Sequence, residues 1–564
     1  MRWTLKEKPQ AAETEALQKA LNVDATTAIL LLQRGIKTFE EAKTFFRPSL
    51  TDLHDPFLMK DMDKAVARIE KAIANNENIL VYGDYDVDGT SSVALMSTYL
   101  KSIHNLVYTY IPNRYDEGYG VSYKGINFAL ENNFTLIVAL DCGIKAIDKV
   151  AHAKELGIDF IICDHHRPGA KIPDAAAVLD PKREDCNYPY KELCGCGVGF
   201  KLIEALASKE GKTAEDLTEY LDLVATAIGA DIVPIDGENR VLAYFGLQVI
   251  NTNPRPGIKA ILAQVEKTEL TITDVVFIVA PRINAAGRMK HGNYAVTLLT
   301  EEDDELATKY AAEINDYNLE RRETDKRITE EALVQIEKNK EQDRLTTVVY
   351  DKDWHKGVIG IVASRLTETY HRPTLVFTKS GEFLAASARS VKGFDVYNAL
   401  EACAEHIEQF GGHKYAAGLT LKEENYEAFK QAFEDEVSKT IDRNLLTPEI
   451  KIDLEIDLDN ITPKFNRILK QFAPYGPSNM TPVFLTKNLI DTGYGKPVGA
   501  DQTHLRLTAT QAGTSKNVVG IGFSLADKFE IISNGKPFKA VYSIDENEWQ
   551  GNISLQMKIR DIKA

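Results

Sequence analysis

The stretch Ile79-Leu80-Val81-Tyr82-Gly83-Asp84-Tyr85-Asp86-Val87-Asp88-Gly89-Thr90 joins an apolar run to three alternating carboxylates. The apolar run predicts a buried strand, and the acids follow at its carboxyl end. Three acids so close in sequence repel one another, so this arrangement favours a positive charge between them. We therefore expect a metal ion at the end of this strand.

Two other interpretations of this stretch remain open. Asp-x-Asp-x-Asp-Gly also begins an EF-hand calcium loop, but the twelfth position, where a bidentate Glu is needed, is Leu95 and no helix is predicted before the loop. Asp and Gly are also ordinary turn residues, so a solvated acidic turn would account for the segment taken alone.

Length and composition predict an ordinary multidomain globular protein. The chain has 564 residues, of which 44% are apolar and 27% charged. The polar start Met1-Arg2-Trp3-Thr4-Leu5-Lys6 and the lack of an apolar run of about 18 residues predict a cytoplasmic protein without a membrane span. The net charge of −16 argues against a protein that coats nucleic acid by bulk electrostatics, although a local basic track remains compatible with it.

The six cysteines are few for this length and lie mostly in apolar or Gly-rich contexts. Reduced thiols in the core are the expected state. Cys186, Cys194 and Cys196 could be considered as zinc ligands, but their spacing fits no common zinc site.

From residue 61 onward the pattern alternates between helices and strands. Strands are predicted over 79–82, 106–111, 135–140 and 159–163. Helices are predicted over 62–75, 91–103, 123–131 and 147–156. This alternation predicts a parallel sheet with right-handed crossovers, and in such sheets ligands bind outside the carboxyl ends of the strands.

Acids and histidines recur at these predicted strand ends. Asp141 follows 135–140, Asp164-His165-His166 follow 159–163, and Asp231 follows an apolar segment over 221–230 that we place at a corresponding end of the sheet. A single instance could be a helix cap or a core histidine. Four such clusters at corresponding ends predict one shared site.

The residue types indicate the chemistry of that site. Carboxylates with one or two imidazoles suit Mn²⁺ or Mg²⁺, whereas zinc would favour more His or Cys. Two such ions about 4 Å apart can activate a water molecule and stabilise charge on a phosphoryl group. The sequence therefore predicts a metal-dependent phosphodiesterase.

In this order and spacing, Gly83 to Gly89, Asp141-Cys142-Gly143, Asp164-His165-His166 and Ala230-Asp231 resemble the DHH phosphoesterase superfamily, and within it the RecJ family. The resemblance implies two Mn²⁺ or Mg²⁺ ions. Carried over by position, Asp86 and Asp141 would bind one ion and Asp88, His165 and Asp231 the other, with Asp141 bridging and with Asp84 and His166 completing or orienting the shells. Many relatives have a His where this chain has Tyr82, so the ligand set of the first ion stays open.

Further segments carry candidate substrate-binding residues. Arg282, Asn284 and Arg288 lie among small residues over 279–289, which predicts a phosphate-binding loop, with a surface turn as the alternative. The RecJ family has a closely similar stretch. Arg114, in a loop after a predicted strand, is a second candidate.

A charged segment over 301–345, with apolar residues at helical spacing, predicts a connecting helix. The α/β unit over 346–446 contains Arg389 and the run Gly411-Gly412-His413, and it resembles the DHH-associated (DHHA1) domain. The Gly-Gly-His motif implies substrate binding, with backbone N–H groups near phosphate and His413 reaching the scissile region.

The segment over 51–300 is the predicted DHH domain, and two further segments lie at the ends of the chain. Short strands over 447–564 predict a small β-barrel, and the resemblance implies an OB-fold that binds single strands by aromatic stacking and a basic groove. Residues 1–50 predict a helical subdomain without a readable function.

Taken together, the resemblance implies a single-strand-specific 5′→3′ exonuclease of DNA repair and recombination that threads DNA between the DHH and DHH-associated domains and releases 5′-mononucleotides. One alternative is a phosphodiesterase of short oligonucleotides or cyclic dinucleotides, which has no evident need for the barrel. Another is a non-catalytic DNA-binding scaffold, against which the intact acids and His165 argue. We expect a monomer that acts on single-stranded DNA, with a helicase and a single-strand-binding protein as partners.

Overall fold

The computed structural model describes residues 1–265, 267, 269–514, 516–549 and 551–564. The chain divides into two compact units, which are considered one at a time. The larger unit contains Trp3–Ala280, Val296–Ala307 and Ile450–Ala564, and the smaller contains Met1–Arg2, Pro281–Ala295 and Thr308–Glu449. Within the described ranges, no helix is long and apolar enough to cross a membrane.

The predicted parallel sheet is confirmed in the larger unit. Its strands lie in the order β3-β2-β4-β5-β6, and each pair of neighbours is parallel. They are β2 (Asn78–Gly83), β3 (Val107–Tyr110), β4 (Phe134–Leu140), β5 (Asp159–Cys163) and β6 (Ala177–Leu179). Leu140 pairs with both Gly83 and Cys163, so the carboxyl ends of β2, β4 and β5 are level with one another.

Helices with apolar faces cover this sheet. They are α4 (Met62–Ala74), α5 (Val87–Ile103), α6 (Tyr123–Glu131), α7 (Ile147–Glu155) and α8 (Gly195–Ser208). A further layer follows, in which α9 (Leu221–Ala230) packs on α5 and α8, and α10 (Gly237–Thr252) packs on α9. Ile126 of α6 and Val150 of α7, for example, share one buried cluster with Leu80 and Ile137 of the strands. Burial of these aliphatic side chains fixes the sheet that carries the acids.

The segment over 221–230 is a helix, α9, so its interpretation as a strand at the sheet edge is wrong. Leu221 to Gly229 are all buried. A helix that is buried all round reads as a continuous apolar run, which periodicity cannot distinguish from a buried strand.

The predicted C-terminal barrel is also confirmed in the larger unit. Its strands are β13 (Leu454–Glu455), β14 (Phe484–Asp491), β15 (Lys496–Val498), β16 (His504–Gln511), β17 (Asn517–Gly522), β18 (Phe538–Trp549) and β19 (Asn552–Lys563). Strand β14 pairs with β18 on one edge and β16 on the other, so the order β14-β18-β19-β17-β16 closes on itself.

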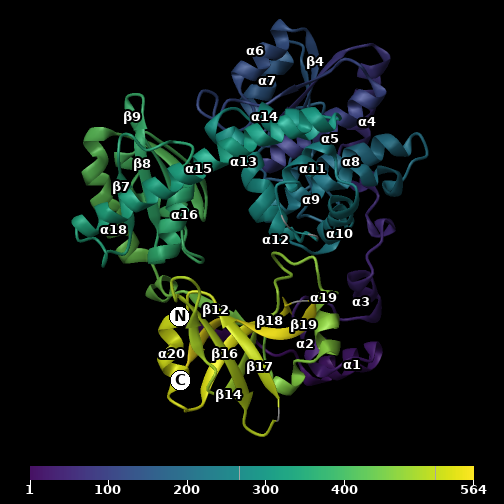
Figure 1. Ribbon diagram of the computed structural model, residues 1–564. Helices are drawn as coiled ribbons and strands as arrows, with labels where there is room; N and C mark the ends of the chain where they lie inside the picture. The colour runs from purple at the N-terminus through teal and green to yellow at the C-terminus, as the bar shows by residue number, and fades with distance from the viewer. Residues whose placement is uncertain (266, 268, 515, 550) are drawn as a thin grey trace. The chain divides into compact units, whose positions relative to one another are not determined.

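The N-terminal helices α1 (Ala11–Leu21), α2 (Ala25–Leu32) and α3 (Phe39–Phe46) form as predicted, and they share the core of the barrel. Leu17, Leu30 and Leu31 belong to the same buried cluster as Phe484 and Leu489 of the barrel. Figure 1 shows the purple helices α1 and α2 beside the yellow strands β18 and β19. The two ends of the chain therefore bury one hydrophobic core together.

The smaller unit has a mixed sheet in the order β10-β11-β9-β8-β7. Its strands are β7 (Thr347–Tyr350), β8 (Thr374–Ser380), β9 (Phe383–Arg389), β10 (Gln409–His413) and β11 (Ala416–Lys422). Its helices include α13 (Ala280–Met289), α15 (Asp304–Lys338), α16 (Ile359–Tyr370), α17 (Val396–Ala402) and α18 (Tyr426–Thr440). The predicted second α/β unit and the long charged helix, α15, are confirmed.

The predicted phosphate-binding loop and the Gly-Gly-His run are both regular elements. Residues 280–289 form α13, in which Ile283, Ala285 and Ala286 are buried. The run Gly411-Gly412-His413 lies in strand β10, paired with β11. Gly412 has φ of 145°, and a Cβ there would lie 2.5 Å from the carbonyl oxygen of Ala416, so a glycine is needed for this pairing.

Candidate metal centre

The carboxyl ends of β2, β4 and β5 deliver acids and histidines to one edge of the parallel sheet. Asp84 follows β2, Asp141 follows β4, and Asp164-His165-His166 follow β5. Asp141 has φ of 58°, in the left-handed region that a short Asp side chain tolerates better than most. This backbone turn belongs to the site and gives Asp141 its position at the strand end.

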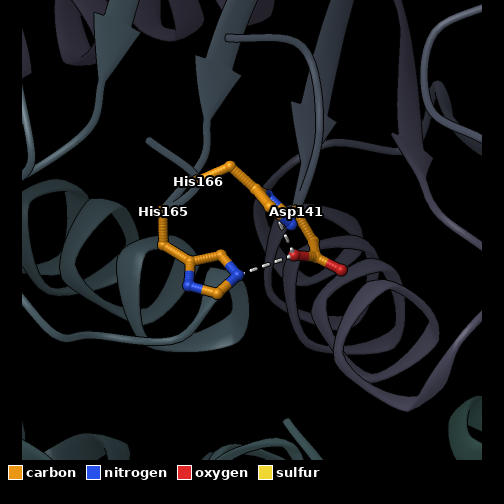
Figure 2. A group of neighbouring side chains, drawn as sticks. All are labelled: Asp141, His165 and His166. Atoms are coloured by element: carbon orange, nitrogen blue, oxygen red, sulfur yellow. Dashed lines mark ion pairs between the residues drawn. The ribbon is translucent and has the colours of Figure 1, made fainter. Parts of the chain in front are cut away.

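Two groups of potential ligand atoms meet at this edge. One contains Asp141, His165 and His166, the other contains Asp88, His165 and Asp231, and the ligand atoms of each group lie within 4.8 Å of one another. His165 Nε2 lies 3.1 Å from Asp141 Oδ1, 3.6 Å from Asp231 Oδ2 and 3.7 Å from Asp88 Oδ2. Figure 2 shows the rings of His165 and His166 directed at the Asp141 carboxylate. His165 is thus shared by both groups.

The first turn of α8 positions Asp88. The N–H groups of Gly195 and Cys196 donate to Asp88 Oδ2 and Oδ1 over 2.6 and 2.7 Å. Backbone N–H groups at a helix N-terminus favour a carboxylate. Cys186, Cys194 and Cys196 are free and buried, and Cys194 Sγ caps α8 by accepting from the N–H of Gly197 over 3.3 Å.

Gly195 also leaves space for Asp141. A Cβ at position 195 would lie 2.6 Å from the Cβ and 2.8 Å from the Cα of Asp141. Neither the Cα nor the Cβ of Asp141 can move away by a side-chain rotation, so the backbone would have to shift. The absence of a side chain at 195 therefore lets α8 approach Asp141 and Asp88 together.

We expect Gly195→Ala to weaken Mn²⁺ binding by about 10–100-fold, because it displaces Asp141 or withdraws the α8 N–H groups from Asp88. Titration of Mn²⁺, followed by the electron paramagnetic resonance signal of the free ion, measures this affinity. Gly169→Ala is the matched control, since a Cβ there would meet nothing nearer than 3.8 Å. Unchanged Mn²⁺ affinity in Gly195→Ala would contradict this role.

Two residues to which the sequence prediction gave no role in the site, Asp164 and Tyr119, orient His166. Asp164 Oδ1 accepts from His166 Nδ1 over 2.7 Å, and Asp164 Oδ2 accepts from the N–H of Ile144 over 2.9 Å. The Tyr119 hydroxyl lies 3.1 Å from His166 Nε2 and donates to the carbonyl oxygen of Asp141 over 3.1 Å. Asp164 was readable as the one acid of the triplet Asp164-His165-His166, whereas nothing in the sequence singles out Tyr119.

Burial and mutual repulsion raise the pKa of the clustered carboxyls. Burial, reinforced by Asp86, raises the pKa of Asp88 to about 7, and burial with Asp88 raises the pKa of Asp231 to about 8. Burial with Asp86 raises the pKa of Asp84, and burial with Asp88 raises the pKa of Asp141. The cluster thus carries more negative charge than its surroundings neutralise.

The two histidines are in opposite states. Burial lowers the pKa of His165 to about 3, so its ring is neutral and offers a lone pair. Burial also opposes the charge of His166, but the hydrogen bond with Asp164 raises its pKa to about 9. The same contact outweighs burial at Asp164 and holds the pKa of that carboxyl at about 2.

The donor set fits a divalent cation. Among the residues that the structure describes, Asp84 Oδ2 and His165 Nε2 are buried without a hydrogen-bond partner, although Nε2 is 3.1 Å from Asp141 Oδ1. Buried polar atoms without partners are costly unless an ion or water satisfies them. Carboxylate oxygens with a neutral imidazole are ligands that Mn²⁺ and Mg²⁺ accept.

The remaining predicted ligands lie around these groups. Asp86 caps α5, with Oδ1 accepting from the N–H of Gly89 over 3.0 Å, and Asp84 Oδ1 accepts from the N–H of Gly120 over 3.3 Å. In the described part of the chain, neither acid belongs to a ligand group as close as those of His165. Arg114 stacks on Tyr85 at 3.7 Å from its ring centre and draws the pKa of Asp84 down against the burial that raises it. The structure therefore brings Arg114 to the acidic edge.

The other predicted substrate-binding residues belong to the smaller unit. Arg288 Nη1 donates to the carbonyl oxygen of Gly357 over 3.0 Å, and Asn284 Oδ1 is buried without a hydrogen-bond partner among the described residues. Arg389 Nη1 donates to Ser387 Oγ over 3.0 Å and to the carbonyl oxygen of Ala388 over 2.7 Å. Gly411, Gly412 and His413 lie on the exposed strand β10. Arg282 is in α13 with Asn284 and Arg288.

Three family models match the chain. The DHH family N-terminal domain matches residues 78–228, the DHHA1 domain matches 343–439, and the RecJ OB domain matches 452–561. These matches cover the parallel sheet, the mixed sheet of the smaller unit and the barrel.

Relatives match over the whole chain. The sequence is 36% identical over 565 residues to the single-stranded-DNA-specific exonuclease RecJ of Bacillus subtilis (strain 168), covering 100% of this chain and 70% of that protein. It is 33% identical over 561 residues to the exonuclease of the same name from Escherichia coli (strain K12), covering 94% and 95%. The crystal structure of RecJ in complex with Mn²⁺ from Thermus thermophilus superposes with a TM-score of 0.86 at 27% identity, covering 100% of this chain and 79% of that one.

Proposed function

The chain belongs to the RecJ family of single-stranded-DNA-specific exonucleases, and from this membership we propose that it hydrolyses single-stranded DNA from the 5′ end and releases 5′-mononucleotides. Solved relatives hold Mn²⁺ or Mg²⁺, and we propose the same ions as its cofactors. The observation that carries the proposal is the meeting of Asp88, Asp141, Asp231 and His165 at one edge of the parallel sheet.

When bound, two divalent cations activate a water molecule and stabilise charge on the phosphoryl oxygens. The chain would hold them through Asp88, His165 and Asp231 on one side and Asp141 and Asp86 on the other. Asp164 accepts from His166 Nδ1 and the Tyr119 hydroxyl lies 3.1 Å from His166 Nε2, so we assign His166 to orienting the shell around Asp141. Arg114 stacks on Tyr85, which supports our assignment of this guanidinium to a phosphate of the strand.

The OB barrel supports a long single strand as the substrate. OB folds bind single strands through aromatic stacking and a basic groove. Phe523 is 56% exposed in the barrel, and its ring lies 5.3 Å from that of His504. We propose that a helicase supplies such strands from duplex DNA, and that a single-strand-binding protein occupies them before digestion.

Digestion of an end-labelled 40-mer tests the proposed function. The strand is presented single-stranded or annealed, labelled at the 5′ or the 3′ end, with Mn²⁺ or with EDTA. We expect Mn²⁺-dependent release of labelled mononucleotide from the 5′ label on the single strand at the earliest times. Digestion that starts at the 3′ end, or proceeds in EDTA, would contradict the proposal.

Arg389 is a candidate for binding the 5′ phosphate. Burial lowers the pKa of its guanidinium, and among the described residues no carboxylate lies within ion-pair distance of it. A Cβ at Gly360, in the first turn of α16, would lie 3.1 Å from Arg389 Nη2, so a helix N-terminus abuts this side chain. A buried guanidinium and a helix N-terminus both favour an anion.

We expect a 5′-phosphorylated strand to be digested faster than its 5′-hydroxyl counterpart, and Arg389→Ala to narrow the difference by roughly tenfold or more. Charge-assisted hydrogen bonds contribute about 1.5–3 kcal/mol, which sets this scale. Initial mononucleotide release from matched substrates measures the ratio. Arg327→Ala, which removes an exposed guanidinium from α15, is the control. Equal rates for both 5′ ends in the unaltered enzyme would contradict the role of Arg389.

A further inference from the structure

Ile232 follows Asp231 at the acidic edge and combines two properties that folding does not account for. Its φ is 59°, in the left-handed region, and its side chain is 66% exposed. A β-branched side chain is strained in this conformation, and Gly, Asn or Asp would adopt it more easily. Because this aliphatic side chain stays exposed, it contributes little hydrophobic stabilisation to the folded state. Neither the conformation nor the residue type stabilises the chain.

The backbone on both sides of Ile232 is anchored. Asp231 ends α9, and its N–H bonds to the carbonyl oxygen of Ala227 over 2.9 Å. Val233 and Ile235 are buried, and the N–H of Ile235 bonds to the carbonyl oxygen of Pro477 over 2.8 Å. The fold therefore holds Ile232 in place between two fixed points and leaves its side chain open to solvent.

This fixed apolar side chain is the next residue after a member of a ligand group. Asp231 Oδ2 lies 3.6 Å from His165 Nε2, within the group that also contains Asp88. The two ligand groups of this edge are polar, with carboxylate oxygens from Asp88, Asp141 and Asp231 and ring nitrogens from His165 and His166. An exposed Ile in such a setting provides an apolar contact for a ligand whose charged part binds to the acidic edge through cations.

We propose that Ile232 contacts the nucleobase beside the scissile phosphate and positions the strand for hydrolysis. This assignment rests on the proposed function. Bases of a single strand expose apolar faces, whereas bases within a duplex are stacked on their neighbours. Contact with Ile232 therefore requires an unstacked nucleotide, and it favours single strands over duplexes at the reacting position.

The test measures KM and kcat of Ile232 variants on substrates that have or lack the terminal bases. Ile232→Asn keeps a residue that tolerates the left-handed conformation but removes the apolar group, and Ile232→Val keeps both branching and apolarity. The substrates are 5′-phosphorylated oligonucleotides whose two 5′-terminal nucleotides are normal or abasic. Such a cycle isolates the contact between side chain and base.

On the normal substrate we expect Ile232→Asn to raise KM about tenfold with little change in kcat, as loss of an aliphatic contact predicts. On the abasic substrate we expect Ile232→Asn and the unaltered enzyme to have the same KM. Ile232→Val should stay close to the unaltered enzyme on both. An unchanged KM for Ile232→Asn on the normal substrate, or the same rise on the abasic one, would overturn the assignment.

Thermal unfolding separates this role from a structural one. Because Asn relieves backbone strain, we expect Ile232→Asn to keep or raise Tm, and a Tm lowered by several degrees would overturn the assignment. Val334→Ala is the matched control, since Val334 is a β-branched residue 63% exposed on α15, and it should change neither KM nor Tm.

Hydrolysis of bis-p-nitrophenyl phosphate with Mn²⁺ separates a failure of the proposed hydrolase function from a failure of the assignment of Ile232. This diester reports on the metal centre without a DNA strand, and its hydrolysis is measured with the unaltered enzyme. An unaltered enzyme that cleaves neither the diester nor the oligonucleotide overturns the proposed function and this inference with it. If the unaltered enzyme cleaves both substrates and Ile232→Asn has the same KM for the normal oligonucleotide, only the assignment of Ile232 is overturned.

Discussion

Replacing Asp141 with Asn is expected to abolish hydrolysis of single-stranded DNA and, at the same time, to stabilise the metal-free protein. Asp141 is 2% exposed, and burial together with the charge of Asp88 raises its pKa above the usual range. Further acids, among them Asp231, act in the same direction. Without cations this carboxylate is repelled by its neighbours, and an isosteric amide removes the repulsion. With cations, the same amide removes a carboxylate that we propose would hold them.

Two measurements check this prediction. In Mn²⁺, the single-turnover rate of Asp141→Asn should fall on the order of a thousandfold, since positioning by two ions supplies most of the rate enhancement. In EDTA, the Tm of the variant should exceed that of the unaltered protein. Asp148→Asn, which removes an exposed acid from the first turn of α7, is the control for both readouts. A variant that keeps more than about a tenth of the rate at saturating Mn²⁺ would show that Asp141 is not an essential ligand.

The sequence predicted the acidic edge well because the position of a residue after a parallel strand determines where it lies. Asp84, Asp141 and His165 all follow strands whose carboxyl ends are level, and this geometry follows from the alternation of strands and helices alone. Asp231 reached the same edge although its preceding segment is a helix. The sequence predicted that Asp231 lies with the other acids, but it did not predict that a helix precedes it.

The supporting contacts could not be predicted because backbone groups make many of them. Asp88 is held by the N–H groups of Gly195 and Cys196, which any two residues except proline could provide. The need for glycine at 195 arises only from the approach of Asp141 in space. Likewise, Tyr119 meets His166 across 47 residues of sequence, and no spacing rule indicates that pairing.

The core that the N-terminal helices share with the barrel could not be predicted from the sequence for a related reason. The apolar faces of α1 and α2 show that these helices need a partner, but periodicity does not say which one. The partner is the barrel, far away along the chain, as Gln33 donating to the carbonyl oxygen of Asp453 over 2.9 Å illustrates with a separation of 420. Removing the barrel would therefore expose the N-terminal helices as well, so point variants are the better probes of its function.

Arg240 is the second residue whose replacement should have a large effect. It lies on α10, is 4% exposed, and its guanidinium stacks 3.8 Å from the ring centre of Phe45. Its nitrogens donate to the carbonyl oxygens of Phe45 at the end of α3 and of Gln471, Phe472, Ala473 and Pro474 between β13 and β14, over 2.8 to 3.3 Å. Burial lowers the pKa of Arg240 to about 10. One side chain therefore joins α10, the end of α3 and the segment between barrel strands β13 and β14.

We expect Arg240→Ala to lower the free energy of unfolding by about 3–5 kcal/mol, because several buried carbonyl oxygens lose their donors at once. Arg240→Lys should fall between, since an ammonium offers three donors without the planar fork that reaches both segments. Urea unfolding and the rate of tryptic cleavage measure the effect, with Arg467→Ala as the control for loss of an exposed guanidinium. Hydrolysis of bis-p-nitrophenyl phosphate should persist below the unfolding temperature, because none of the proposed metal ligands contacts Arg240. A stability within about 1 kcal/mol of the unaltered protein would mean that the shared apolar core, rather than this guanidinium, holds the three segments together.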